Sequence, residues 1–280
     1  MDATLITGGF PGIVQSWTPG TTRTEFLRTS FASPLSPLPA AGELSLLGEF
    51  PEASRSRSVL EAVGSGERTF SAIAAEAGGA GALPSGTLSP LLAMLQAKGI
   101  IAADLPLSEK ADTKNKRYRI ADPYLRFWLA FLQRAIPLVE RGRGDVALER
   151  VERSWTTWRG RAVEPLVRES LLRLLPSGEW PETEAVGGRW NRRNNPEVDL
   201  VGADREPVAR RVHFVGSIKW LDRQPFGRHE NDALVRHVPA VPGATPETAL
   251  VAVSRSGVAD DVPLAACWGP EDLLRARRPG

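Results

Sequence analysis

The sequence contains very little cysteine and no long apolar run, and both absences exclude classes of protein. Cys267 is the only cysteine in 280 residues, which excludes an internal disulfide framework and a multi-cysteine zinc site. We expect Cys267 to be a small buried apolar residue in a reducing cytoplasm. No stretch approaches the roughly 20 apolar residues of a membrane helix, and the N-terminus lacks the pattern of a secretory signal. The sequence therefore predicts a soluble, cytoplasmic protein without a membrane partner.

The chain also lacks a strong charge imbalance. Its 35 lysine and arginine residues face 33 acidic ones, so the formal net charge is only +2. A surface that is basic all over is therefore not expected, and any nucleic-acid surface must be local. A chain of 280 residues that is 42% hydrophobic is long enough for two domains with a sizeable core.

A phosphate-binding loop is missing as well. The pattern G-x-x-x-x-G-K-[S/T] occurs nowhere in the sequence. The segment GSGERTF at 64–70 has glycines and a hydroxyl residue but lacks the lysine that contacts the nucleotide phosphates. We therefore expect no ATP as a cofactor and no ATPase activity from this chain alone.

Residues 55–122 have the pattern of a winged helix-turn-helix. Three short helices are expected in SVLEAVGSG (58–66), TFSAIAAEAGG (69–79) and SGTLSPLLAMLQAKG (85–99). In the third, four leucines recur at the spacing of one buried helical face: Leu88, Leu91, Leu92 and Leu95. GIIAADLPL (99–107) and KRYRI (116–120) then favour two strands joined by a polar loop. Three helices followed by a two-stranded wing are typical of a DNA-binding module.

The basic residues of this region are candidates for contacts with DNA. The third helix has no arginine for bidentate readout of guanine, so sequence-specific recognition is expected to be weak. Several basic side chains could instead neutralise phosphates, with strong dependence on salt. These candidates are Lys98, Lys114, Lys116 and Arg117 on the helix and wing, and Arg192 and Arg193 in a later loop. The alternative is that they lie in solvated loops.

The remaining segments predict a linking helix and an α/β domain. DPYLRFWLAFLQRAIPLVERG (122–142) is an apolar helix whose aromatic rings follow core spacing rather than the pattern of a nucleotide-stacking surface. A further helix (154–175) is followed by strands in 183–190, 197–202 and 209–220, a helix in 226–238, a strand in 248–257 and a last helix after Pro270. This order predicts a sheet whose first strands are antiparallel and whose last strand follows a helical crossover, within an α+β or α/β fold.

Two strand ends carry charged residues that could form one site. In a strand, side chains at i and i+2 share a face, so Glu197 points with Asp199, and Ser217 points with Lys219. If the two strands are neighbours, the four side chains converge. Acidic oxygens can hold a divalent cation, and a lysine can orient an attacking water beside a phosphate. The alternative is a charge pair without chemistry.

The segments EVDLVG and SIKW, in this order of elements, resemble the PD-(D/E)XK restriction-endonuclease-like fold. The resemblance implies a DNA endonuclease site with Mg²⁺, in which Asp199 and Lys219 are catalytic. It also implies that Asp199 and the helical Glu164 bind the metal, and Glu197 is a further candidate ligand. Ser217 stands where that motif has an acidic residue or glutamine, so the site loses one formal charge. The sequence is consistent with two hypotheses, an enzyme that cuts DNA and a catalytically degenerate relative of such an enzyme.

A wider resemblance rests on TGGFP (7–11), RYRIADPYLRFW (117–128) and WRGRAVEPLVRESL (158–171). Together with the strand motifs, these segments resemble the C-terminal half of archaeal-type ATPases of the AAA/STAND group, which has a winged helix and a domain of unknown function. The resemblance implies a lid-like helical remnant at 1–50, a winged helix at 55–122, a linking helix at 123–150 and a nuclease-like domain at 151–280.

Two functions follow as hypotheses. The first is a DNA-associated protein with a winged helix and a nuclease-like domain. The second is a noncatalytic regulatory module of a split or truncated ATP-binding protein, with a separate ATPase chain or a second copy of itself as partner. An exposed apolar patch around Phe10, Ile13, Val14 and Trp17 would favour the second hypothesis.

Overall fold

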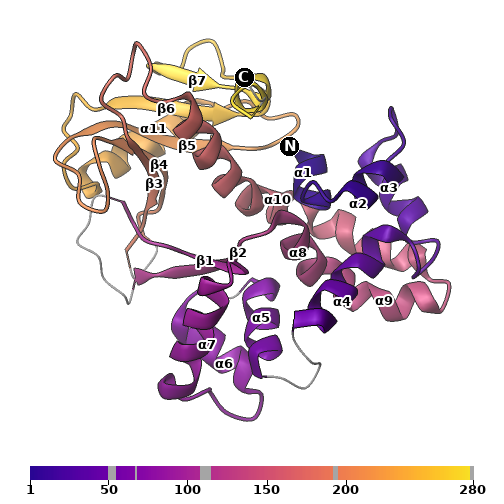
Figure 1. Cartoon of the computed structure of the whole chain (residues 1–280). Helices are drawn as coiled ribbons and strands as arrows, with labels where there is room; N and C mark the ends of the chain where they lie inside the picture. Colours follow the sequence, from indigo (N-terminus) through magenta and orange to yellow (C-terminus); the bar gives the residue numbers. More distant parts are fainter. Residues whose placement is uncertain (50–54, 67, 108–114, 192–194, 278–280) are drawn as a thin grey trace. The chain divides into compact units, whose positions relative to one another are not determined.

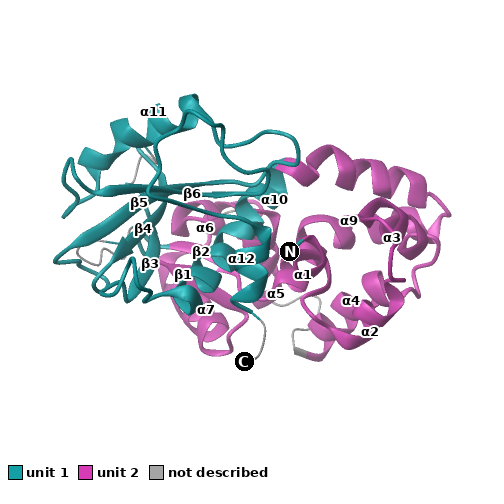
Figure 2. Ribbon diagram, turned by 90° about the horizontal axis from the view of Figure 1, so that it is seen from above, with its two compact units in different colours: residues 1, 105–116, 157–280 teal, residues 2–104, 117–156 magenta. Residues whose placement is uncertain are grey.

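The protein has an α+β fold, as the sequence predicts. The computed structural model describes residues 1–49, 55–66, 68–107, 115–191 and 195–277 (Figure 1). Its contacts divide the chain into two compact units, which Figure 2 colours separately. Unit 1 comprises Met1, residues 105–116 and residues 157–280, and unit 2 comprises residues 2–104 and 117–156. The four-part division of the chain stays a prediction. No helix in the described ranges has both the length and the apolar character needed to cross a membrane.

Unit 2 begins with short helices. They are α1 (Asp2–Thr7), α2 (Pro11–Ser16), α3 (Arg23–Ser30) and α4 (Pro37–Glu49). The side chains of Thr22 and Glu25 form a capping box that fixes the start of α3. Pro37 and Pro39 lie in the first turn of α4, where the backbone needs no amide donors from its own residues.

Unit 2 contains three helices followed by two antiparallel strands, the order of elements expected for residues 55–122. These elements are α5 (Arg55–Ser65), α6 (Phe70–Gly78), α7 (Ser85–Ala97), β1 (Ile101–Asp104) and β2 (Arg117–Ile120). The Thr69 hydroxyl accepts a hydrogen bond from the Ala72 amide at 3.3 Å and caps α6. The strands are antiparallel, with Ile101 opposite Ile120. Three of the four leucines of the third helix are fully buried: Leu88, Leu92 and Leu95.

The aromatic helix forms part of the core of unit 2. It consists of α8 (Pro123–Phe127), a π-helical turn η2 (Trp128–Leu132) and α9 (Gln133–Glu140). The Tyr124 hydroxyl donates to the Leu38 carbonyl at 2.7 Å, and the Trp128 indole donates to the Pro39 carbonyl at 2.9 Å. Both rings are almost fully buried. The core interpretation of this helix is therefore confirmed, and it holds α4 in place.

Unit 1 is built on a five-stranded sheet. Its elements are the part of α10 (Gly144–Leu174) from Thr157 onward, β3 (Ala185–Arg189), β4 (Val198–Ala203), β5 (Val212–Lys219), α11 (Arg228–His237), η3 (Val238–Ala240), β6 (Ala249–Ser254), β7 (Ala266–Trp268) and α12 (Pro270–Arg275). The strand order is β3-β4-β5-β6-β7, antiparallel as far as β5 and parallel beyond it. The predicted crossover is present, and only the short β7 was not foreseen.

The core of unit 1 explains the apolar strands. Val201, Val215 and Ala252, from three neighbouring strands, pack with Leu234 and Val238 from the α11 region. A strand with both faces covered has a continuous apolar run rather than alternation.

Cys267 does not belong to this core. It lies exposed on the edge strand β7, so the expectation of a buried cysteine was wrong.

The described ends of the connection between β1 and β2 belong to unit 1. The Leu107 amide donates to the Gly188 carbonyl of β3 at 2.8 Å, and the Trp190 indole donates to the Asn115 carbonyl at 2.9 Å. Leu107 is only 3% exposed and belongs to the core of the sheet. The described ends of this connection thus cover the edge of β3, and residues 108–114 between them lie outside the described residues.

Candidate functional site

Asp199 and Ser217 meet across two neighbouring strands, as the spacing predicts. The antiparallel register pairs Leu200 of β4 with Gly216 of β5, which brings the next residues along each strand together. Asp199 Oδ2 accepts hydrogen bonds from the Ser217 hydroxyl at 2.8 Å and from the Ile218 amide at 2.9 Å. Two neutral donors from β5 therefore satisfy this carboxylate oxygen.

Lys219 is paired with a carboxylate that the strand pattern did not indicate. Its ammonium bonds Glu230 Oε1 in the first turn of α11, and the other Glu230 oxygen accepts from the Gly227 amide at 3.1 Å. Each side chain of the pair is 19% exposed. Burial alone would raise the pKa of Glu230, but the hydrogen bonds from Lys219 and from the backbone amides hold it below the ordinary value. The lysine charge is thus balanced within the protein.

The Glu164 carboxylate forms an ion pair with Arg168, which lies one turn further along α10. Arg168 contacts Glu164 Oε2 at 3.2 Å, and each of the two side chains is 13% exposed. The same guanidinium donates twice to the backbone carbonyl of Asp199, at 3.1 and 2.9 Å. A Cβ atom at Gly188 would lie 2.6 Å from this guanidinium, so glycine leaves room for Arg168 to reach β4. Arg168 therefore positions the Asp199 backbone, and Glu164 helps to hold Arg168.

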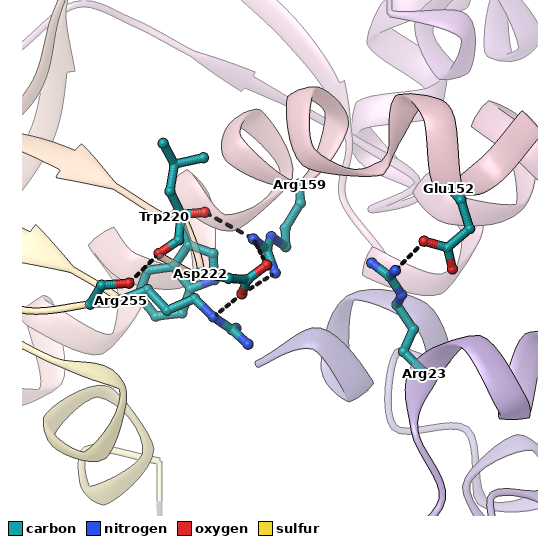
Figure 3. Close-up of polar contacts among 8 residues, drawn as sticks. Arg23, Glu152, Arg159, Trp220, Asp222 and Arg255 are labelled. Carbon is teal, nitrogen blue, oxygen red and sulfur yellow. Dashed lines mark hydrogen bonds and ion pairs between the residues drawn. The ribbon is translucent and has the colours of Figure 1, made fainter. Parts of the chain in front are cut away.

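The segment that follows Lys219 is anchored to α10 by a buried arginine. Arg159, 1% exposed, forms two hydrogen bonds with the Asp222 carboxylate at 3.1 and 3.0 Å and one with the Trp220 carbonyl at 3.2 Å. Asp222 also pairs with Arg255 at 2.6 Å, just after β6. Figure 3 shows these side chains directed toward one another. The network fixes the end of β5 and thereby the position of Lys219.

The arrangement of donors does not fit the Mg²⁺ ion that the resemblance implies. Mg²⁺ requires near-octahedral oxygen ligands, and carboxylates are its usual protein ligands. Here Ser217 is neutral, Glu230 is engaged by Lys219 and Glu164 by Arg168. In the described part of the chain, no three histidine, cysteine, aspartate or glutamate side chains are grouped so that they could hold a metal ion. Glu197 lies half-buried just before β4.

The predicted nucleic-acid contacts are only partly accessible. Lys98 is exposed at the end of α7, Lys116 is half-buried, and Arg117 is buried with 5% exposure. Arg117 is therefore not part of an accessible surface. The other candidates, Lys114, Arg192 and Arg193, lie outside the described residues.

Two residues of the site were missed by the strand pattern, although the sequence contains a signal for each. Glu230 stands three residues after Gly227, the spacing of a glutamate in a capping box. Arg168 stands four residues after Glu164, the spacing of an ion pair on one helical face. Neither signal says that the side chain also reaches β4 or β5.

The apolar residues near the N-terminus form a smaller patch than expected. Ile13 is 1% exposed, and Trp17 stacks on Phe26 with ring centres 4.1 Å apart. Phe10 and Val14 remain 38% and 47% exposed. The exposed apolar surface in this region thus comes from two side chains.

Comparisons with known proteins show a distant relationship. Residues 128–231, less than half of the chain, match a family described as "Archaea bacterial proteins of unknown function". A stretch of 174 residues is 26% identical to an uncharacterized protein of Methanocaldococcus jannaschii, and the match covers 62% of this chain and 37% of the relative's length. No solved structure matches. The chain is therefore similar to archaeal and bacterial proteins whose activity is not described.

Proposed function

We propose that this protein associates with DNA through its winged helix and its nuclease-like unit, and that it binds DNA without cutting it. The order of three helices and two antiparallel strands in unit 2 supports DNA binding, because this is the architecture of a DNA-reading module. The adjoining Asp199 and Lys219 strands in unit 1 support descent from a nuclease-like fold, an argument from analogy.

The observation that supports the absence of DNA cleavage is the ion pair between Lys219 and Glu230. A lysine that assists hydrolysis must direct its charge at the phosphate or the attacking water. Here Glu230 balances that charge. A neutral serine also hydrogen-bonds Asp199, where the nuclease motif has a residue that can ligate a metal.

Measurements of DNA binding and of DNA cleavage together distinguish a protein that only binds DNA from one that also cuts it. Binding of labelled duplex DNA is measured by fluorescence anisotropy over a range of salt concentrations, and cleavage of supercoiled DNA is followed with Mg²⁺ or Mn²⁺. We expect salt-dependent binding and no cleavage. Metal-dependent cleavage that disappears in both Asp199→Ala and Lys219→Ala would refute the noncutting proposal.

A matched pair of variants tests the winged helix. Lys98 is exposed at the end of α7, and Arg236 is exposed on α11 in unit 1. If Lys98 contacts one phosphate, Lys98→Ala should lower the slope of log affinity against log salt by about 1, and Arg236→Ala should change it less. Equal effects of the two substitutions would show that α7 has no special part in binding.

A second candidate function, a docking module, is favoured by the exposure of Phe10 and Val14. Two neighbouring apolar side chains exposed by 38% and 47% offer a small contact surface. We propose as its partner either a second copy of this chain or a separate ATPase chain. Light scattering should then show self-association that a Phe10→Ser/Val14→Ser variant loses and a Leu35→Ser control keeps, since Leu35 is 86% exposed elsewhere in unit 2. A monomer at all concentrations would exclude the self-association.

A further inference from the structure

We infer that Ser217 keeps divalent metal out of the Asp199 site, and that a carboxylate at position 217 opens a latent metal site. The inference rests on the proposed noncutting function and explains it. It concerns metal affinity, so it can fail while DNA binding holds, and it can hold while DNA binding fails.

Position 217 determines whether Asp199 needs a cation. The Ser217 hydroxyl lies 2.8 Å from Asp199 Oδ2 and donates a hydrogen bond to it. A carboxylate reaching the same place would bring two negative charges together, and such a pair is stable only when one group is protonated or a cation lies between them. Serine removes this requirement because it supplies a neutral donor.

The Ile218 amide reinforces the same effect. It donates to the same Asp199 oxygen at 2.9 Å. A metal ion at that oxygen would have to compete with two donors whose positions are fixed by the pairing of β4 with β5. With serine at position 217, Asp199 Oδ2 thus has two hydrogen-bond donors from the protein.

Glu230 completes the charge balance on the other side of the strand end. Its carboxylate bonds Lys219, and both side chains are largely buried, with 19% exposure each. The Gly227 amide holds the second Glu230 oxygen at 3.1 Å, so the helix start fixes the carboxylate. Lys219 with this partner is neutral as a pair, and the pair repels neither a cation nor an anion strongly. Glu230 is therefore retained in the test, so that Lys219 stays paired when a carboxylate is introduced at position 217.

Glu164 cannot compensate in the present arrangement. Its carboxylate contacts Arg168, whose guanidinium is at the same time bound to the Asp199 carbonyl. To ligate a metal, Glu164 would have to leave an arginine that is itself needed to hold β4. The carboxylates of Asp199, Glu230 and Glu164 are thus each engaged by donors of the protein.

Manganese binding measured by electron paramagnetic resonance tests the inference without any activity. We expect the wild-type chain to bind Mn²⁺ more weakly than about 1 mM, the weak end of protein carboxylate sites. A Ser217→Glu variant should bind at least about tenfold more tightly, because affinity rises with the charge of the ligands. The gain should disappear when Asp199→Asn is added.

The neutral variant Ser217→Gln is the matched control for the size of the new side chain. It should bind Mn²⁺ no better than the wild type. Thermal unfolding with and without Mn²⁺ provides a second measurement in case the acidic variant folds poorly alone. Mn²⁺ should then raise the melting temperature of the acidic variant and leave the neutral one unchanged.

Two results would overturn the inference. The first is Mn²⁺ binding to the wild type at micromolar concentration that Asp199→Asn abolishes, since the site would then hold metal with serine present. The second is an acidic variant that shows neither Mn²⁺ binding nor a Mn²⁺-dependent rise in melting temperature.

Discussion

Replacing Glu230 with glutamine should destabilise unit 1 by about 2 kcal/mol at neutral pH. The substitution keeps the size of the side chain and one oxygen for the Gly227 amide, which now accepts from Glu230 at 3.1 Å. It removes the negative charge beside Lys219, whose side chain is only 19% exposed. The main loss is therefore that of the ion pair, with little loss of packing.

The magnitude follows from the burial of the pair. Exposed ion pairs contribute about 0.2–1 kcal/mol, and removing one partner of a fully buried pair costs about 3–5 kcal/mol. A pair with 19% exposure on both sides lies between these limits. Lys219→Met should cost less, because the Gly227 amide still bonds the remaining carboxylate. The double variant should be more stable than the sum of the single effects implies, with a coupling energy of about 1–2 kcal/mol.

Urea unfolding followed by tryptophan fluorescence measures these differences, and its pH dependence supplies an independent check. The folded-state pKa of Glu230 lies below the ordinary value of 4.5. The contribution of the pair is thus complete above about pH 4.5 and is lost as the pH falls through the folded-state pKa. The gap between wild type and Glu230→Gln should narrow over this acidic range.

Additive effects in the double variant would refute the reasoning. So would a Glu230→Gln protein as stable as the wild type at pH 7, or a stability gap that widens on acidification. Each of these results would mean that Lys219 finds its charge balance elsewhere.

Other predictions concern packing and a helix cap. Gly42→Ala should lower the free energy of unfolding by more than about 3 kcal/mol, because the new Cβ would lie 2.3 Å from the Trp128 ring. Gly48→Ala in the same helix is the control. Its Cβ meets no atom within 4 Å, so this substitution should stabilise the protein by about 0.5–1 kcal/mol. Burial raises the pKa of Asp122 although two backbone amides oppose it, so the carboxylate costs stability as the pH rises above 3.8. Asp122→Asn, which keeps the cap, should therefore match or exceed the wild type at pH 7, and Asp122→Ala should lose about 1 kcal/mol in denaturant unfolding. Leu107→Ala should cost about 2–5 kcal/mol, because Leu107 is 3% exposed in the core of unit 1. A change below 1 kcal/mol would indicate a wing that moves independently of the sheet.

Much of the secondary structure could be predicted from local pattern. The apolar spacing of α7, the cap at Thr69 and the mainly apolar segments of β4 and β5 are consequences of neighbouring residues in the sequence. The three-residue strand β7 was not predicted, since a segment that short has no period to detect. Its position at the sheet edge also explains why Cys267 is exposed.

The candidate site was predictable in part. The two-residue period of a strand places Ser217 and Lys219 on one face, and the order of elements makes β4 and β5 neighbours. The partner of Lys219 was not predictable in this way, because α11 follows the strand through a loop whose path determines which helical residue faces β5. Glu230 was visible only as a helix cap.

The sequence by itself determined the elements, their order and the charged residues at the strand ends, because these depend on local periodicity and residue type. The tertiary structure alone decided how those charges are balanced. Asp199 Oδ2 accepts hydrogen bonds from Ser217 and Ile218, and Glu230 balances the charge of Lys219. Charge balance depends on distances between groups that are far apart in the chain, and those distances exist only after the strands and helices have packed.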